Sequence, residues 1–112
     1  MIVFISSKNP VLESSKEDRF GRCAWLIKID TDTNLWKAFP NPGASQSGGA
    51  GVAAAQFVID QYAGTVISGD FGPNAASAFR ASNIEMRLFT KDISTVQQAI
   101  DSFKQSKLPA FQ

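Results

Sequence analysis

The feature that most constrains the fold is a pair of glycine-bearing loops, each of which leads into a helical pattern. Ser68–Ala75 follows the apolar run Thr65–Ile67, and Ser47–Val52 precedes a second helix-like segment. Strand–loop–helix junctions of this kind leave the first backbone N–H groups of each helix free, and clusters of free N–H groups favour anions. The two loops are therefore predicted to face a ligand.

Length and charge place the chain among small globular domains. At 112 residues, with 44% hydrophobic content and nine Phe, it suits one compact domain with one core. We predict a single domain over residues 1–107 and a loose C-terminal tail over residues 108–112. Lys and Arg number 11 and Asp and Glu number 10, scattered without a block, so a nucleic-acid surface is not expected.

The residue types present also restrict location and chemistry. No apolar stretch approaches the roughly 18 residues of a membrane span, and the apolar start Met1–Ile5 lacks the basic lead of a signal peptide. A single cysteine cannot form the intrachain disulfides that stabilise many small secreted domains, so a cytoplasmic protein is expected. The chain has no His, which removes the usual general base and the commonest metal ligand.

Hydrophobic periodicity predicts an α/β fold with five strands and three helices in three layers, α/β/α. The expected strands cover residues 2–6, 23–29, 35–39, 65–68 and 85–89, and the expected helices cover 49–63, 73–81 and a last segment capped by Ser94 or Thr95. We expect a mixed five-stranded sheet whose second strand is antiparallel to the other four.

In this arrangement, the loops 6–21, 41–49 and 68–74 and the turn after Phe89 meet at one edge of the sheet. The start of the second strand, Arg22–Cys23, lies at the same edge. Because ligands of open α/β sheets bind outside the carboxyl ends of the parallel strands, this edge is the predicted site.

The glycines at this edge allow two interpretations. Gly48–Gly51 resembles a phosphate cradle, since glycine lets the backbone approach a ligand closely. It lacks the Lys-Ser or Lys-Thr end of a P-loop, so a nucleotide triphosphatase is not expected. Alternatively, the small residues only let a helix pack tightly on the sheet. Gly69 and Gly72 allow the same two interpretations, and Asp70 between them would repel a phosphate.

Arg19–Cys23 brings two guanidinium groups and a thiol together. Arginine holds anions through several N–H donors, and nearby positive charge lowers the pKa of a thiol and favours the thiolate that metals prefer. Cys23 is thus the candidate metal ligand, although a lone cysteine beside a strand is also an ordinary small core residue. No nucleophile–base pair is evident, and Asp70 has no evident companion carboxylate for metal-dependent hydrolysis, so an enzyme is not expected.

Taken together, three segments resemble the dinitrogenase iron–molybdenum cofactor biosynthesis family: Arg19–Arg22, Gly48–Gln56 and Ser68–Ala75. The resemblance covers nearly the whole chain. It implies an α/β/α domain with a ribonuclease-H-like motif, and members that carry or insert iron–molybdenum precursor clusters or hold related molybdenum–copper sulfide clusters. The positions that match the family's motifs are Arg19, Phe20, Gly21, Arg22, Gly48, Gly49, Gly51, Gly69, Gly72, Pro73 and Asn74. Cys23 directly follows the first of these segments, Asp70 lies within the third, and both complete the predicted site.

The resemblance implies a small non-catalytic carrier or scaffold for an iron–molybdenum or related metal–sulfur cluster or its precursor, bound transiently. Its partners would be proteins that donate or accept the cluster. The alternative is an interaction or regulatory module that keeps the fold without the cluster. Such a module would meet a partner through the same loops or a Phe-rich surface, with Asp70 and Phe71 in contact.

Overall fold

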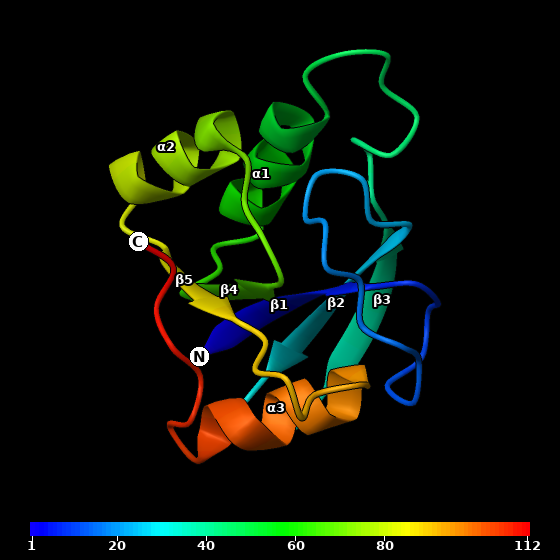
Figure 1. Cartoon of the computed structure of the whole chain (residues 1–112), viewed down its shortest axis with the longest axis vertical. Coiled ribbons are helices and arrows are strands. Elements are labelled where there is room, and N and C mark those ends of the chain that lie inside the picture. Colours follow the sequence, from blue (N-terminus) through cyan, green and yellow to red (C-terminus); the bar gives the residue numbers. More distant parts are fainter.

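The computed structural model describes all 112 residues of the chain, which form one mixed sheet between two layers of helices (Figure 1). The strands are β1 (Ile2–Ser7), β2 (Trp25–Asp30), β3 (Trp36–Pro40), β4 (Thr65–Ser68) and β5 (Glu85–Leu88). The helices are α1 (Ala50–Asp60), α2 (Pro73–Ala81) and α3 (Val96–Lys104). All eight predicted elements are present. Helix α1 ends three residues before its predicted end, and Tyr62 beyond it adopts a left-handed backbone with φ 59°.

The sheet has the order β3-β2-β1-β4-β5. Strand β1 pairs with β2 antiparallel and with β4 parallel, β2 pairs with β3 antiparallel, and β4 pairs with β5 parallel. Strand β2 is therefore the one strand that runs against the other four, as predicted. The start of β2 and the ends of β1, β3, β4 and β5 lie at the same edge of the sheet.

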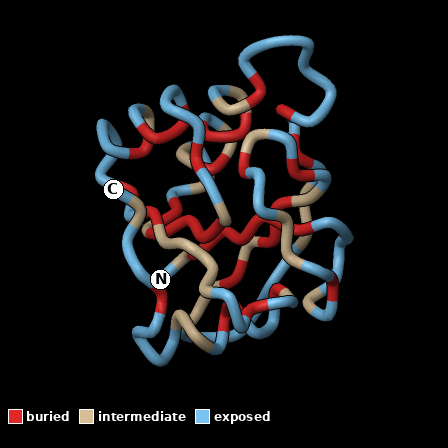
Figure 2. Tube along the Cα trace, viewed as in Figure 1, coloured by how far each residue is buried: buried red, intermediate tan, exposed pale blue.

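Helices cover both faces of the sheet, which confirms the three-layer α/β/α prediction. Helices α1 and α2 lie side by side on one face, and α3 lies alone on the other (Figure 1). The central strand β1 is buried almost throughout, whereas β3 at one end of the sheet is exposed or half-buried along its length (Figure 2). Alternate residues of β1 enter two separate cores. Phe4 packs beneath α1 and α2, while Val3 and Ile5 pack against α3.

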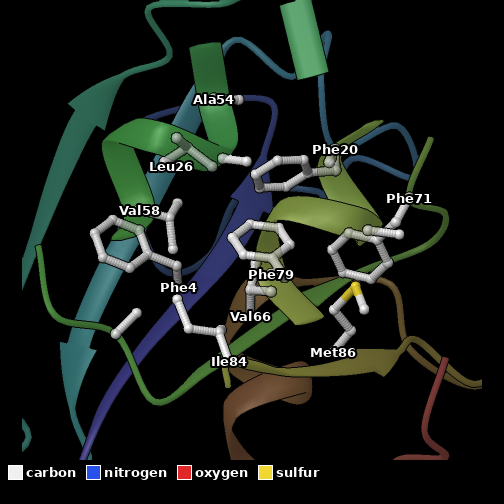
Figure 3. Packing of buried hydrophobic residues seen from close by; sticks show 14 of the residues in the cluster. Phe4, Phe20, Leu26, Ala54, Val58, Val66, Phe71, Phe79, Ile84 and Met86 are labelled. Atoms are coloured by element: carbon white, nitrogen blue, oxygen red, sulfur yellow. The ribbon is translucent and has the colours of Figure 1, made fainter. Parts of the chain in front are cut away.

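Phenylalanine rings fill the larger core, beneath α1 and α2 (Figure 3). The ring of Phe20, from the loop before β2, lies 5.3 Å from that of Phe79 and 5.5 Å from that of Phe71, measured between centroids. Edge-to-face and tilted contacts at these distances stabilise aromatic clusters beyond simple burial. The loops that carry Phe20 and Phe71 are therefore anchored to the core by their own side chains.

Helix α3 begins at a capping box. The side chain of Thr95 accepts a hydrogen bond from the backbone N–H of Gln98, and the Gln98 side chain accepts one from the N–H of Thr95. This reciprocal pair satisfies two N–H groups that the first turn would otherwise leave free, and it confirms Thr95 as the cap. No helix in the structure is both long and apolar enough to cross a membrane.

The last five residues form part of the fold, so the prediction of a loose tail is wrong. The N–H of Leu88 donates to the carbonyl of Pro109, and the N–H of Phe111 donates to the carbonyl of Met86. Leu108 is buried, and the ring of Phe111 lies 5.2 Å from that of Phe71. The tail occupies the outer edge of β5 as a short paired segment. Its composition gave no sign of this because the pairing joins residues far apart in sequence.

Replacing Phe111 with alanine should therefore destabilise the protein. A half-buried ring contributes less than a fully buried one, and we expect Phe111→Ala to lower the free energy of unfolding by about 1–2 kcal/mol in urea denaturation. The matched control is Gln112→Ala, because Gln112 is exposed; the expected change is under about 0.5 kcal/mol. Equal unfolding midpoints for the two variants would contradict the docked tail.

Candidate functional site

An open pocket of about 310 Å³ lies at the predicted edge of the sheet. Three segments surround it: the loop before β2, the start of α1, and the β4–α2 loop with the start of α2. Its lining residues are Arg19, Phe20, Gly21, Arg22, Gly49, Ala50, Gly51, Val52, Asp70, Gly72, Pro73, Asn74 and Ala75. Residues separated by more than fifty positions in sequence thus face one cavity.

Two helices point their N-termini into the pocket. Helix α1 is preceded by Gly49 and α2 by Gly72, and neither residue has a side chain that can cap the helix. In the first turns of these two helices, five lining residues carry backbone N–H groups without an acceptor in the chain: Ala50, Gly51, Val52, Asn74 and Ala75. Each helix dipole adds roughly half a positive charge at this end. The pocket is therefore a concentrated donor surface for an anion.

The charged side chains add to this positive character. Arg19 and Arg22 are exposed and line the pocket, and Asp70 is its one acidic residue. The Arg22 Nη1 donates to the carbonyl of Gln46, which places its guanidinium between two loops. One carboxylate oxygen of Asp70 accepts a hydrogen bond from the N–H of Phe71, at 2.8 Å. Two guanidinium groups and one carboxylate leave a formal charge of +1 before the helix dipoles are counted.

The loop that carries the two arginines is fixed across the strand ends. The buried hydroxyl of Ser6 donates to the carbonyl of Glu17, and the hydroxyl of Ser68 donates to the carbonyl of Asp18. A Cβ atom on Gly69 would lie 2.7 Å from the Asp18 Cα. Gly69 is thus required by a close contact between two backbones, and it lies outside the pocket lining.

A buried asparagine joins the other two loops. The Nδ2 of Asn41 donates to the carbonyls of Gly21 and Cys23, at 3.1 and 2.9 Å, and its Oδ1 accepts from the N–H of Gly43 at 2.9 Å. Gly43 packs against the first residue of α1, since a Cβ there would lie 2.3 Å from the carbonyl oxygen of Ala50. Asn41 and Gly43 therefore set the position of the α1 N-terminus relative to the loop of the arginines.

Nine predicted site residues line the pocket: Arg19, Phe20, Gly21, Arg22, Gly49, Gly51, Asp70, Gly72 and Asn74. Pro73, carried over from the family resemblance, lines it as well. Gly48 stands in open space beside it, Gly69 packs on Asp18, and Cys23 lies in the core. Phe71, suggested above as a partner contact, is buried with only 3% exposed and is not available to a partner in this structure.

Cys23 is enclosed rather than presented to the pocket. Its side chain is fully buried in the larger core, and the Asn41 Nδ2 lies 3.5 Å from its sulfur. Burial raises the pKa of the thiol to about 12. The expectation that the neighbouring arginines lower this pKa is therefore wrong, because both guanidinium groups lie on the exposed side of the loop and desolvation dominates. Its assignment as a metal ligand stays a prediction.

Three lining residues and one support residue were missed in the sequence. Ala50, Val52 and Ala75 contribute through backbone N–H groups, which composition does not distinguish from those of ordinary helical residues. Their position in the first turn after a glycine was the available signal. Asn41 is predicted only as the start of the loop 41–49, although an asparagine between two prolines is a suitable residue to fix loop backbones.

An α/β domain with an open, positively charged pocket at the strand ends is the class that the fold and site define. The sequence profile of the family described as dinitrogenase iron-molybdenum cofactor matches residues 1–106, and the chain belongs to this family. The family's description links it to the iron–molybdenum cofactor. Comparison with curated protein sequences gave no match.

Solved structures show the same fold. The apo form of the orange protein from Desulfovibrio gigas is 29% identical, with a TM-score of 0.91, and the alignment covers 98% of this chain and 92% of that one. A candidate NifB protein from Thermotoga is 28% identical over 97% of this chain and 91% of its own, with a TM-score of 0.83. A candidate dinitrogenase from Methanocaldococcus jannaschii is 16% identical over 100% and 95%, with a TM-score of 0.71, and shows the fold alone.

The close contact at Gly43 predicts a large effect of a single methyl group. Gly43→Ala should lower the free energy of unfolding by about 1–3 kcal/mol, because the added Cβ meets the rigid backbone of α1. Gly48→Ala is the matched control, since nothing lies within 4 Å of a Cβ at that position. Urea denaturation of both variants measures the difference. Equal stabilities would contradict the packing of Gly43 on Ala50.

The buried thiol predicts a pH-dependent stability. An unfolded chain ionises Cys23 near its ordinary value of 9.0, whereas the folded chain keeps the proton to about 12. The unfolded state therefore binds fewer protons above pH 9, and the contribution of this group to the free energy of unfolding falls there by up to about 1.4 kcal/mol per pH unit. In Cys23→Ala, the free energy of unfolding should not show this part of the fall above pH 9. Below pH 8, its pH dependence should be parallel to that of the wild type. Parallel curves throughout would contradict the raised pKa.

Proposed function

We propose that the protein is a non-catalytic carrier or scaffold for an anionic metal–sulfur cluster, of the iron–molybdenum or a related molybdenum–sulfur type, or for its precursor. The observation that supports this most directly is the convergence of five free N–H groups and two arginines on one open pocket. Membership of the iron–molybdenum cofactor family supplies the class of cargo.

The chemistry of the lining suits such a cargo. Metal–sulfide clusters are usually anionic, and their sulfur atoms can accept hydrogen bonds from backbone N–H groups and from guanidinium. Arg19 and Arg22 can each offer several donors to one anion, and the helix N-termini offer fixed ones. The small residues Gly51, Gly72 and Ala75 leave room for a bulky inorganic anion against the backbone.

The lining also suits transient holding. It contains no thiol and no imidazole, and no group of three or more His, Cys, Asp or Glu side chains is arranged to bind a metal ion. A cluster in the pocket would be held by charge and hydrogen bonds, which exchange faster than metal–thiolate bonds. Asp70 reduces the positive charge and would weaken the hold further. A carrier that passes its cargo from a donor protein to an acceptor protein must bind the cluster and also release it readily.

Binding of tetrathiomolybdate, alone and with Cu(I), tests the proposal. The expected result is co-elution of a coloured complex on gel filtration, with affinity that falls as salt is added. Arg22→Ala and Arg19→Ala should each weaken binding about tenfold, the loss of one charge-assisted hydrogen-bonding group. Lys107→Ala is the matched control, since it removes an exposed positive charge that does not line the pocket.

The same experiment tests Cys23. If the cluster is held only by the pocket, Cys23→Ala binds it with unchanged affinity and an unchanged spectrum. A lost complex in Cys23→Ala would instead assign the thiol as a metal ligand. Absence of any co-eluting cluster, or equal binding by the arginine variants and the wild type, would contradict the proposal.

A further inference from the structure

A second cavity lies at the opposite end of α1, beside the exposed edge of the sheet. It has a volume of about 550 Å³, and its lining includes Lys28, Leu35, Lys37, Phe39 and Gln61. Gln61 directly follows α1, whereas the pocket described above is at the start of that helix. We call this second cavity the edge groove. It shares no lining residue with the pocket.

The strand beside the edge groove has unused hydrogen-bonding groups. Strand β3 is the last strand of the sheet, so only its β2 side is paired. Two hydrogen bonds show which residue pairs of the β2–β3 ladder are bonded. The N–H of Asp30 donates to the carbonyl of Leu35, and the N–H of Asn41 donates to the carbonyl of Ala24. Because bonded and non-bonded pairs alternate, the N–H and carbonyl groups of Trp36 and Ala38 point away from β2. Pro40 presents only a carbonyl.

The side chains of the edge groove are apolar and basic. Leu35 is 74% exposed, and the half-buried ring of Phe39 lies on the same face of the strand, with Lys37 between them. Lys28 donates to the side chain of Gln61 at 3.0 Å, and the Lys37 ammonium lies 5.1 Å from the Phe39 ring. Neither lysine forms a salt bridge.

The acidic residue of the groove does not neutralise these lysines. Asp30 lies 3.6 Å from the N-terminal ammonium of Met1. The same ammonium lies 3.0 Å from Asp32, so the ammonium and these two carboxylates together carry one negative charge. Against the two positive charges of Lys28 and Lys37, this leaves a net charge of +1 around the edge groove. Unused backbone donors, apolar side chains and unmatched positive charge lie within one cavity and along its bordering strand.

We infer that β3 binds an extended segment of a partner protein, in which an acidic residue faces Lys37 and is flanked two positions away on each side by an apolar residue. The segment would add a sixth strand to the sheet, using the N–H groups of Trp36 and Ala38. Side chains two positions apart share a face of a strand. The acidic residue then lies over Lys37, and its apolar neighbours lie near Leu35 and Phe39.

A second copy of this chain does not fit the same edge. Two β3 strands paired about a two-fold axis would place the two Lys37 side chains opposite or diagonal to each other, about 5–8 Å apart. No carboxylate of β3 is available to compensate, and Pro40 shortens the ladder. Lysine and proline on an edge strand are common devices against self-pairing. They still allow a partner of opposite charge.

The inference concerns a different surface from the proposed cluster site and does not depend on it. A partner bound along β3 leaves the pocket at the start of α1 open. The structure can therefore hold a protein segment and a small anion at the same time, one at each end of α1.

Titration with two seven-residue peptides tests the inference. In each peptide, threonine occupies positions 1, 3, 5 and 7, and phenylalanine occupies positions 2 and 6. Position 4 is glutamate in one peptide and lysine in the other. We expect the glutamate peptide to bind at least tenfold more tightly in isotope-labelled NMR titrations, with the largest shifts at the amides of Trp36 and Ala38. Equal affinities of the two peptides, or shifts confined to other regions, would overturn the inference.

Two variants separate the charge from the backbone contribution. Lys37→Glu should reverse the preference between the peptides, and it changes an exposed side chain. Ala38→Pro removes a donor that points away from β2 and should weaken binding at least tenfold, with thermal unfolding as the check on folding. Lys107→Ala is the control, since it removes an exposed positive charge outside the edge groove, and it should bind the glutamate peptide as the wild type does. A Lys37→Glu variant with an unchanged preference, or a wild-type dimer abolished by Ala38→Pro, would overturn the inference.

Discussion

The rest of the site depends on two close contacts between backbones, where Gly43 meets the carbonyl of Ala50 and Gly21 meets Gly51. A Cβ on Gly43 would lie 2.3 Å from that oxygen, and a Cβ on Gly21 would lie 3.0 Å from the backbone of Gly51. These contacts hold the start of α1 against the loop that carries both arginines. The free N–H groups and the guanidinium groups face one cavity only because no side chain separates the two backbones.

Charge at this edge comes from the backbone as much as from side chains. Gly49 and Gly72 stand at the positions where Ser, Thr, Asp or Asn would normally cap a helix, so the first turns of α1 and α2 keep their donors free. Helix α3 shows the contrast in the same chain, since its capping box closes the N-terminus on itself. The chain caps the helix that faces away from the pocket and leaves open the two that face it.

The sequence was sufficient for the fold because its patterns are local. Apolar runs and helix starts predicted every element, and the second strand was correctly predicted to be antiparallel to the other four. Predictions failed where distant residues decide the outcome. Cys23 lies next to Arg22 in sequence, yet its thiol faces the core, and the last residues pair with β5 across the molecule. Gly69 was predicted as a site residue and Gly43 was not, yet both owe their identity to backbone contacts that only the folded chain reveals.

The length of α1 relates the two cavities. Eleven residues rising about 1.5 Å each place its ends roughly 16 Å apart, which separates the pocket at its start from the edge groove at its end. That distance exceeds the Debye length of about 8 Å at physiological salt, so a bound anion and an acidic segment would repel each other only weakly through solvent. The two sites can therefore be occupied independently. A protein of this size can then be tethered to a partner while its anion pocket stays accessible.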